Sequence, residues 1–231
     1  MSERTRTAVI SGGAGGLGQA LARALQDRNW MTILVDRDTG KLPTTAFQWP
    51  VSCDLTDPEA RRIAFAKILK IYPEIDLVIY NAGITQIGAF DRSDETSHRK
   101  VFEINYFAAV EMARAFLNSV RAARGTHLAI SSVAGFSPLY HRTAYAGSKH
   151  AVEGFFKSLR SEEKSFGVRT LIAAPSFVAT NIGNEQRQAD GIARPGSAGD
   201  GIDYMTPDDA AAVILKGYDK SCPMIPVGRI A

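Results

Sequence analysis

Short apolar runs alternate with longer stretches of helical periodicity along most of the chain. The apolar runs are rich in valine, isoleucine and leucine and show no polar alternation, which is typical of strands buried on both faces. The pattern predicts strands over residues 7–10, 31–36, 47–51, 75–80, 127–131, 168–173 and 224–227. It predicts helices over residues 17–28, 94–124 and 143–165, one capped by Thr56 or Asp57 that runs through Ile71, and one that opens at Thr206-Pro207.

Strands that alternate with helices in this way form a mostly parallel sheet with helices on both faces. Because such crossovers are nearly always right-handed, the expected fold is a doubly wound α/β Rossmann fold of about seven strands. We expect one domain over residues 1–231. Residues 181–201 are polar and glycine-rich, so we expect a flexible substrate lid at about 181–205.

The longest helical stretch, residues 94–124, has apolar residues on more than one face. We expect its core face to contain Val101, Phe102, Ile104 and Val110. The four histidines share no metal-ligand spacing, so we expect no metal site and surface or sheet-edge positions for them. They are His98, His127, His141 and His150.

Composition narrows the class of protein. With 231 residues, of which 45% are hydrophobic, the chain can bury a core without disulfides or metals. A net charge of +3 is too small for a nucleic-acid footprint. Cys53 and Cys222 match no metal or redox spacing. No apolar run reaches the ~18 residues of a membrane helix, and the few residues before the first strand leave no room for a signal peptide. We therefore expect a cytoplasmic protein without nucleic-acid or membrane partners.

A glycine-rich turn, Ser11 to Gly18, lies between the first strand and the first helix. Glycines let the backbone approach a ligand closely, and the helix N-terminus beyond them attracts a pyrophosphate. Asp36 ends the second strand, where a carboxylate can accept both hydroxyls of an adenosine ribose. The same carboxylate repels a 2′-phosphate, whereas Arg37 would attract one. The balance of these two side chains favours NAD(H) over NADP(H). The alternative is that the glycines form only a tight turn and that Asp36 is a solvated acid in a loop.

Tyr145 and Lys149 are four residues apart near the start of a predicted helix, so their side chains share one face. An ammonium about 4 Å from the phenol would lower the tyrosine pKa by about 3, close to neutrality. Ser132 is expected to end the fifth strand, at the sheet edge where open α/β folds bind ligands. An isolated Tyr-x-x-x-Lys also occurs by chance, but these three groups converge beside the expected dinucleotide site.

In these residues the chain resembles the short-chain dehydrogenase/reductase family over nearly its whole length. Ser11-Gly12-x-x-x-Gly16-Leu17-Gly18 resembles the family's Thr-Gly-x-x-x-Gly-x-Gly, with serine in place of threonine. Ser131-Ser132 and Tyr145 to Lys149 have the family spacing, which identifies Ser132 rather than Ser131 as the catalytic serine. Other matching positions are the Asp54-Leu55 pair, Tyr80-Asn81-Ala82-Gly83, the helix asparagine Asn105, and Pro175 with Thr180.

The resemblance implies an NAD(P)-dependent oxidoreductase that transfers a hydride between the nicotinamide C4 and a small alcohol or ketone. Tyr145 would exchange the proton, Lys149 would lower its pKa and bind the ribose, Ser132 would bind the substrate oxygen, and Asn105 would hold a water that links Lys149 to solvent. The implied cofactor-binding residues are Ser11, Gly12, Gly16, Leu17, Gly18, Asp36, Arg37, Asp54, Leu55, Asn81, Ala82, Gly83, Tyr145, Lys149, Pro175 and Thr180.

The family also implies a homodimer or homotetramer, paired through the helices around residues 101–116 and 151–159. Two positions depart from its motifs. Tyr80 replaces an asparagine that ties the fourth strand to its neighbours, so that end of the sheet needs another support. Ser176 replaces a glycine beside the nicotinamide pocket. Residues 137–142 are expected to line the substrate cleft, with apolar wall from Pro138, Leu139 and Tyr140.

Two other functions compete with this one. A redox sensor that binds NAD(H) without turnover would use the same fold. Such a sensor does not need the catalytic serine, tyrosine and lysine, and their presence in this chain therefore favours the enzyme. A dehydratase or epimerase of the extended type needs a longer C-terminal substrate domain. Sugars, small hydroxy acids, aryl ketones and acyl thioesters all stay open as substrates.

Overall fold

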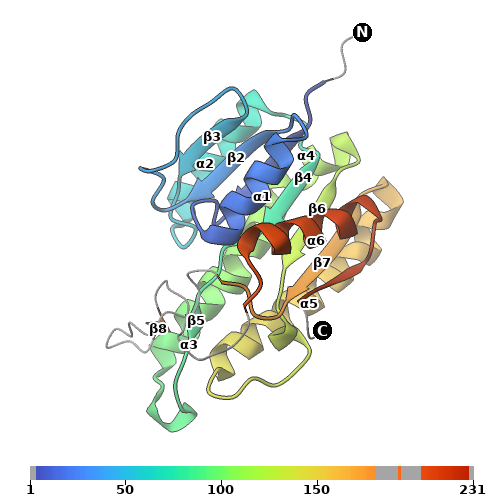
Figure 1. The fold of residues 1–231 in the computed structure, drawn as a ribbon. Coiled ribbons are helices and arrows are strands. Elements are labelled where there is room, and N and C mark those ends of the chain that lie inside the picture. The colour runs from blue at the N-terminus through green and yellow to red at the C-terminus, as the bar shows by residue number, and fades with distance from the viewer. Residues whose placement is uncertain (1–3, 180–191, 194–203, 229–231) are drawn as a thin grey trace.

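The computed structural model describes residues 4–179, 192–193 and 204–228. Seven strands form one parallel sheet in the order β3-β2-β1-β4-β6-β7-β9 (Figure 1). The predicted α/β class and doubly wound parallel sheet are confirmed, and every predicted strand is present with bounds that shift by two residues at most. The strands are β1 (Thr7–Ser11), β2 (Met31–Asp36), β3 (Gln48–Ser52), β4 (Leu77–Tyr80), β6 (Thr126–Ile130), β7 (Arg169–Pro175) and β9 (Met224–Val227).

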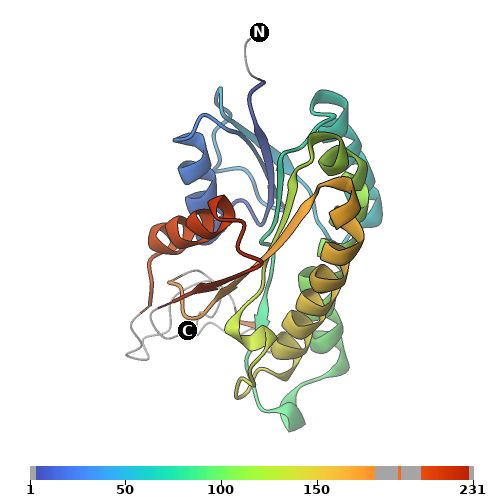
Figure 2. The same cartoon turned by 90° about the vertical axis from the view of Figure 1, so that its right-hand side faces the viewer.

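Helices cover both faces of the sheet (Figure 2). Helices α1 and α6 pack side by side on one face, and α2, α4 and α5 cover the other. A pair of two-residue strands, β5 (Thr85–Gln86) and β8 (Ile192–Ala193), forms a small antiparallel sheet that the sequence pattern does not predict. The helices are α1 (Gly16–Gln26), α2 (Pro58–Ile71), α3 (Glu95–Phe102), α4 (Ala108–Ala123), α5 (Thr143–Glu163) and α6 (Pro207–Asp219).

Each face of the sheet has its own hydrophobic core, because successive side chains of a strand point to opposite faces. In β1, Val9 belongs to the core under α2, α4 and α5, whereas Ala8 and Ile10 belong to the core under α1 and α6. All three are fully buried. Both faces are covered, so the strand sequences show no polar alternation.

Side-chain caps fix where α2 and α6 begin. The Asp57 carboxylate accepts hydrogen bonds from the backbone N–H groups of Glu59 and Ala60 at the start of α2. Thr56, the other predicted cap, instead donates its hydroxyl to Asp54. The Thr206 hydroxyl accepts from the Asp209 N–H and caps α6 as expected.

The predicted core face of residues 94–124 is only partly correct. Of the four residues expected there, only Val101 is fully buried, whereas Phe102, Ile104 and Val110 are half-buried. A π-helical turn, Glu103–Phe107, separates α3 from α4, and the buried face includes a polar residue, Asn105, which an apolar pattern cannot reveal. The buried residues of this segment include Val101, Asn105, Ala108, Met112, Phe116 and Val120.

The order of the strands creates a binding crevice. Chain connections run outward in opposite directions from β1 and β4, which are neighbours in the centre of the sheet. Ligands of open α/β sheets bind beyond the carboxyl ends of the strands at such a reversal point. The Gly-rich turn after β1 and the loop after β4 therefore meet at the same edge. Among the described residues, no helix is long and apolar enough to cross a membrane.

Candidate active site

A cavity of about 1640 Å³ opens along this edge of the sheet. It exceeds the roughly 300–1,000 Å³ of an ordinary ligand pocket, so it has room for a dinucleotide and a second molecule. Two separate groups of predicted residues line it. One lies on the Gly-rich turn and the ends of β2 and β3, and the other lies on the loops after β4 and β6 and the start of α5.

The Gly-rich turn forms a cradle that only glycine can form. Gly12 has φ +65°, and a Cβ there would lie 2.9 Å from the Cα of Ala82. A Cβ at Gly18 would collide with the Gly12 carbonyl group. Helix α1 begins immediately after Gly15, which provides no side-chain cap. The first N–H groups of α1 thus lie beside open space next to Gly12, Gly15 and Gly16, an arrangement that fits the pyrophosphate of a dinucleotide.

Ser11 and Asn81 hold this turn against the loop after β4. The Ser11 hydroxyl accepts hydrogen bonds from the N–H groups of Asn81 (3.0 Å) and Ala82 (3.2 Å). In return, Asn81 Nδ2 donates to the carbonyl oxygens of Ser11 (3.1 Å) and Gly12 (3.0 Å). Asn81 and Ala82 line the cavity, but Ser11 and Gly18 do not. Ser11 and Gly18 therefore lie behind the wall of the cradle, away from the cavity.

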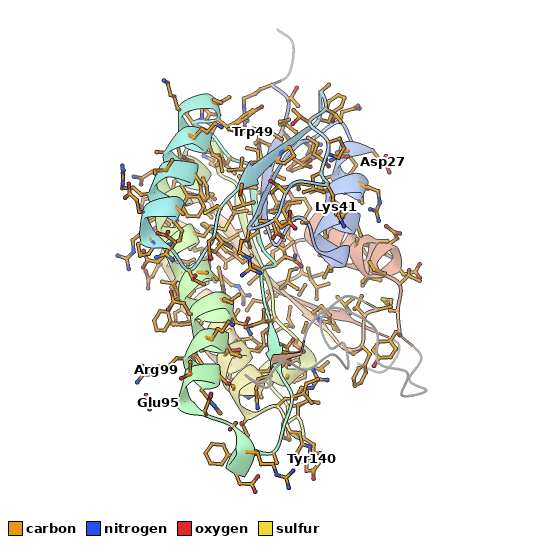
Figure 3. The ribbon with its side chains drawn as sticks, turned by 90° about the vertical axis from the view of Figure 1, so that its left-hand side faces the viewer. Asp27, Lys41, Trp49, Glu95, Arg99 and Tyr140 are labelled. Carbon is orange, nitrogen blue, oxygen red and sulfur yellow. The ribbon has the colours of Figure 1, made fainter. Side chains whose placement is uncertain are left out.

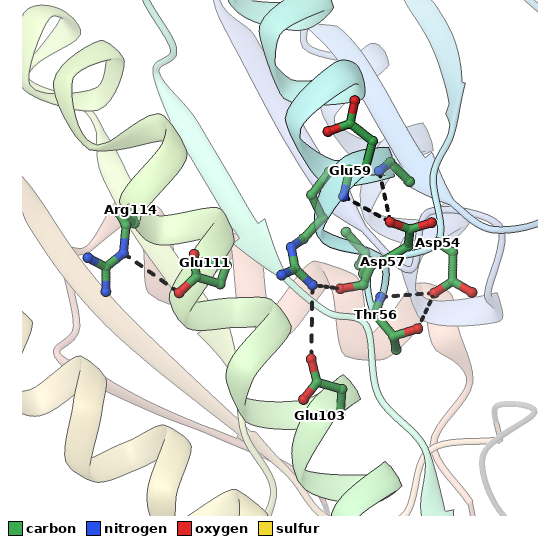
Figure 4. A network of polar contacts seen from close by, with 10 residues as sticks. Asp54, Thr56, Asp57, Glu59, Glu103, Glu111 and Arg114 are labelled. Atoms are coloured by element: carbon green, nitrogen blue, oxygen red, sulfur yellow. Dashed lines mark hydrogen bonds and ion pairs between the residues drawn. The ribbon is translucent and has the colours of Figure 1, made fainter.

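The other end of the cradle is bordered by acids and bases. Asp36 Oδ2 accepts a hydrogen bond from the Ala14 N–H at 3.0 Å, which fixes the carboxylate at the cavity wall. Arg37 and Lys41 line the same end, and Lys41 was not anticipated from the sequence. Asp54 accepts from the backbone N–H and the hydroxyl of Thr56 (Figure 4). These two bonds lower the pKa of Asp54, and nearby arginine charges add to the effect.

Ser132, Tyr145 and Lys149 meet at the opposite end of the cavity. Tyr145 and Lys149 are 8% and 5% exposed, and Lys149 Nζ lies 5.7 Å from the centre of the Tyr145 ring. The same Nζ donates to the Ile130 carbonyl oxygen at 2.8 Å. Ser132 lies two residues beyond the end of β6, not at its last position. Its hydroxyl accepts from the Ala134 N–H, whereas the Ser131 hydroxyl donates to Glu153.

The expected lowering of the Tyr145 pKa is not found in the structure. Burial raises the pKa of Tyr145, while a hydrogen bond with Ser132 and the positive charge of Arg142 act in the opposite direction. Burial also lowers the pKa of Lys149, to about 8. No sequence pattern indicates the effect of Arg142, because charge effects depend on distances that the fold decides.

The comparison with protein families decides the identity of this arrangement. A family described as short chain dehydrogenase matches residues 6–191. The chain belongs to the short-chain dehydrogenase family.

Individual relatives agree with this assignment. The chain is 34% identical over 203 residues to dehydrogenase/reductase SDR family member 7B of Rattus norvegicus, and the match covers 81% of this chain but only 62% of the rat protein. A short-chain dehydrogenase from Streptomyces avermitilis has a similar structure, with a TM-score of 0.85 and 26% identity over 98% of this chain and 89% of that chain. One from Burkholderia cenocepacia, in complex with NADP, has a TM-score of 0.84 and 21% identity over 100% of this chain and 91% of that chain.

Asn105, the position that matches the family's helix asparagine, lies in the π-helical turn and is 2% exposed. Its Nδ2 donates to Ser148 Oγ (2.9 Å) and to the Ile84 carbonyl (3.0 Å), and its Oδ1 accepts from the Ile84 N–H (2.8 Å). Asn105 does not line the cavity, although a Cβ at Gly83 would lie close to both its Oδ1 and Lys149 Nζ. The water-holding role of Asn105 stays a prediction.

Tyr80 stands in place of the family's strand asparagine, and a buried hydrogen bond of its side chain supports the end of β4. Tyr80 Oη lies 2.6 Å from Nδ1 of His127, and the Tyr80 ring packs on Phe156 with centroids 4.7 Å apart. His127 is fully buried in β6, so its predicted surface or sheet-edge position is wrong. The error arises because β6 is a central strand with a neighbour on each side. His141 and His150 are exposed, and His98 is half-buried.

The predicted substrate wall is only partly correct. Leu139 and Arg142 line the cavity, but Tyr140 is 84% exposed and stacks on His141 at the rim of the molecule (Figure 3). Ser176 lines the cavity as expected, as does Pro175. Thr180 and most of the predicted lid at 181–205 lie outside the described residues. Tyr204, near the end of the predicted lid, also lines the cavity, and wall residues not anticipated from the sequence include His98, Arg99, Lys100 and Phe177.

Proposed function

We propose that the protein transfers a hydride between C4 of the nicotinamide of NAD(H) and the carbinol or carbonyl carbon of a small substrate, with Tyr145 as the general acid and base. The observation that supports this most is the convergence of Ser132, Tyr145 and Lys149 in the same cavity as the glycine cradle. The dinucleotide supplies or accepts the hydride when bound, whereas the protein positions the reactants and moves the proton.

Each of the three side chains has a separate task. In the reductive direction, the Tyr145 hydroxyl gives its proton to the substrate oxygen as the hydride reaches the carbon. The Ser132 hydroxyl, which already interacts with Tyr145, donates a hydrogen bond to the same oxygen and stabilises its charge. Lys149 Nζ, beside the Ile130 carbonyl, binds the nicotinamide ribose. In the oxidative direction, Tyr145 takes the proton from the alcohol.

A substitution of Tyr145 separates this function from that of a redox sensor. Tyr145→Phe removes only the hydroxyl oxygen, so turnover is expected to fall by roughly 10²–10⁴-fold while NADH binding, followed by its fluorescence, is kept. Tyr72→Phe is the matched control, because Tyr72 directly follows α2, does not line the cavity, and has a hydroxyl that makes no hydrogen bond among the described residues. Unchanged turnover in Tyr145→Phe would refute the mechanism, and tight cofactor binding without reduction of any carbonyl in a broad panel would favour the sensor.

The preference for NAD(H) rests on Asp36. Its carboxylate is held at the adenosine end by the Ala14 N–H, where it can accept ribose hydroxyls and would repel a 2′-phosphate. Asp36→Asn keeps an oxygen acceptor for Ala14 but removes the charge. We expect NADH to bind more tightly than NADPH to the native protein, and Asp36→Asn to narrow that ratio at least tenfold in paired fluorescence titrations. Arg37→Gln is the companion variant. If NADPH binds more tightly to the native protein and Arg37→Gln abolishes this, the preference is for NADP(H).

A further inference from the structure

A buried carboxylate, that of Glu153, lies behind the proposed catalytic group. Glu153 follows Lys149 by one turn of α5, on the helix face that also carries Tyr145, and its side chain is 2% exposed. Its Oε1 accepts a hydrogen bond from the Ser131 hydroxyl at 3.0 Å, and its Oε2 accepts one from Lys157 Nζ at 2.6 Å. A buried charge is costly unless it is paired. Lys157 supplies the counter-charge, whereas the bond to Ser131 joins the carboxylate to the loop after β6.

The chain that leaves β6 is bound to α5 at consecutive residues. Ile130, the last residue of β6, accepts a hydrogen bond on its carbonyl oxygen from Lys149 Nζ at 2.8 Å. The next residue, Ser131, donates to Glu153, one turn further along the helix. Ser132 follows directly and interacts with the phenol of the proposed general acid. Because peptide units are planar and rigid, a fixed Ser131 limits the positions that Ser132 can take.

The turn after Ser132 packs on the same carboxylate. The N–H of Gly135, which belongs to this turn, donates to the Ser132 carbonyl oxygen at 2.8 Å. A Cβ at Gly135 would lie 2.9 Å from Cδ of Glu153, nearer than side-chain carbons approach one another. Gly135 therefore lies directly against Glu153. Ser132 stands between two residues, Ser131 and Gly135, that both contact this side chain.

Glu153 itself does not line the cavity, so it can affect the reaction only through these neighbours. Resting on the proposed function, we infer that Glu153 is a positioning residue that holds the Ser132 hydroxyl where it meets the substrate oxygen. A hydrogen-bond donor stabilises the charge of a transition state best when it is aimed in advance, and small displacements of such groups are costly. The ion pair with Lys157 keeps the carboxylate in one orientation, because it engages the oxygen that is not bound to Ser131.

A second buried carboxylate of α5 separates positioning from stability. Glu163, the last residue of the helix, is 1% exposed and pairs with Arg121 at 2.6 Å. It lies at the opposite end of α5 from Tyr145 and does not line the cavity. Replacement of either carboxylate removes a buried, paired charge, so both replacements should lower the thermal midpoint. Only replacement of Glu153 should also disturb Ser132.

Steady-state kinetics test the inference, with NADH and a ketone that the native protein reduces. Glu153→Ala should lower kcat roughly tenfold or more. The loss should appear in kcat rather than KM, because Ser132 acts on charge that develops in the transition state. The Kd for NADH, followed by its fluorescence, should not change. Glu153→Gln keeps an oxygen acceptor for Ser131 and should recover part of the lost kcat. Glu163→Ala is the matched control, expected to lower the thermal midpoint but to keep kcat.

Ser131→Ala isolates the hydrogen bond, because it leaves the pair of Glu153 and Lys157 intact and creates no unpaired charge. It should lower kcat as well. Both substitutions break the same bond, so Glu153→Ala should reduce kcat by a smaller factor in the Ser131→Ala protein than in the native one. Crystal structures of Glu153→Ala and Glu163→Ala, which need no turnover, should show Ser132 displaced in the first and unmoved in the second.

Three results would overturn the inference. The first is native kcat in both Glu153→Ala and Ser131→Ala. The second is an equal loss of kcat in Glu153→Ala and Glu163→Ala, which would reduce Glu153 to a contribution to stability. The third is an unmoved Ser132 in the crystal structure of Glu153→Ala. If the native protein reduces no carbonyl compound, the proposed function is wrong, and the two crystal structures still decide whether Glu153 positions Ser132.

Discussion

The phenol oxygen of Tyr80 lies 2.6 Å from Nδ1 of His127, in the middle of the parallel sheet. Tyr80 ends β4 and His127 lies in the adjacent strand β6, and both side chains are buried. Burial raises the pKa of Tyr80 well above its ordinary value and lowers the pKa of His127 to about 4. The bond therefore joins two neutral groups near neutral pH, and it supports the strand end that leads into Asn81 and the cradle.

Removing the Tyr80 hydroxyl tests this support. Tyr80→Phe keeps the packing on Phe156 but leaves His127 Nδ1 buried without its partner. We expect the free energy of unfolding to fall by about 1–3 kcal/mol, measured by urea denaturation at pH 7.5. Tyr72→Phe should change it by less than about 0.5 kcal/mol. Equal effects of the two substitutions would show that the Tyr80–His127 bond contributes no stability.

The lowered pKa of His127 predicts a loss of stability in acid. In the unfolded chain His127 binds a proton near the ordinary histidine pKa of 6.5, but in the folded protein only near 4. The unfolded state therefore holds more protons between these values, and stability falls as the pH drops from 6.5 to 4, by roughly 3 kcal/mol in total. His127→Gln lacks this titration, so its stability should depend less on pH in that window. Parallel pH profiles of the two proteins would contradict the assignment.

Gly135 keeps the loop after β6 in place. A Cβ at this position would collide with the Glu153 carboxylate and the Ser131 hydroxyl, which are hydrogen-bonded to each other directly behind Ser132. Gly135→Ala should therefore displace Ser132 and lower kcat by roughly tenfold or more, since small displacements of catalytic groups are costly. At Gly154, in the exposed face of α5, nothing lies within 4 Å of an added Cβ. Gly154→Ala should keep kcat and raise stability by about 0.5–1 kcal/mol. Unchanged kcat in Gly135→Ala would contradict the positioning of Ser132 by this loop.

A buried carboxylate links α4 to the end of α5. The Glu163 side chain is 1% exposed and receives two hydrogen bonds from Arg121, of 2.6 and 2.9 Å. Arg121→Met would leave this carboxylate without its counter-charge, and we expect a loss of about 2 kcal/mol, because one side of Arg121 still faces solvent. Arg62→Met, which breaks an exposed pair with Glu59, should leave the thermal midpoint unchanged. Equal midpoints for both variants would show that the Glu163 charge is solvated rather than buried.

Local chemistry made much of the site predictable. The cradle follows from glycine's backbone freedom and its place after the first strand, and the meeting of Ser132, Tyr145 and Lys149 follows from the common edge at which parallel strands end. Which predicted residues reach the cavity was not predictable. Ser11 and Gly18 lie behind the cradle wall, Asn105 is enclosed by hydrogen bonds, and Tyr140 points outward. A motif gives a residue's position in the chain but not the direction in which its side chain finally points.

The sequence by itself determined the order of strands and helices, the parallel sheet, the dinucleotide cradle and the family. These features depend on backbone preferences and on apolar periodicity, which act over short distances along the chain. Only the tertiary structure decided that His127 is buried against Tyr80, that the helical segment from α3 to α4 buries Asn105, and that Ser132 and Arg142 counteract the effect of burial on the pKa of Tyr145. Hydrogen bonds, burial and charge depend on distances between residues far apart in the sequence, and the packing of the sheet and its helices sets those distances.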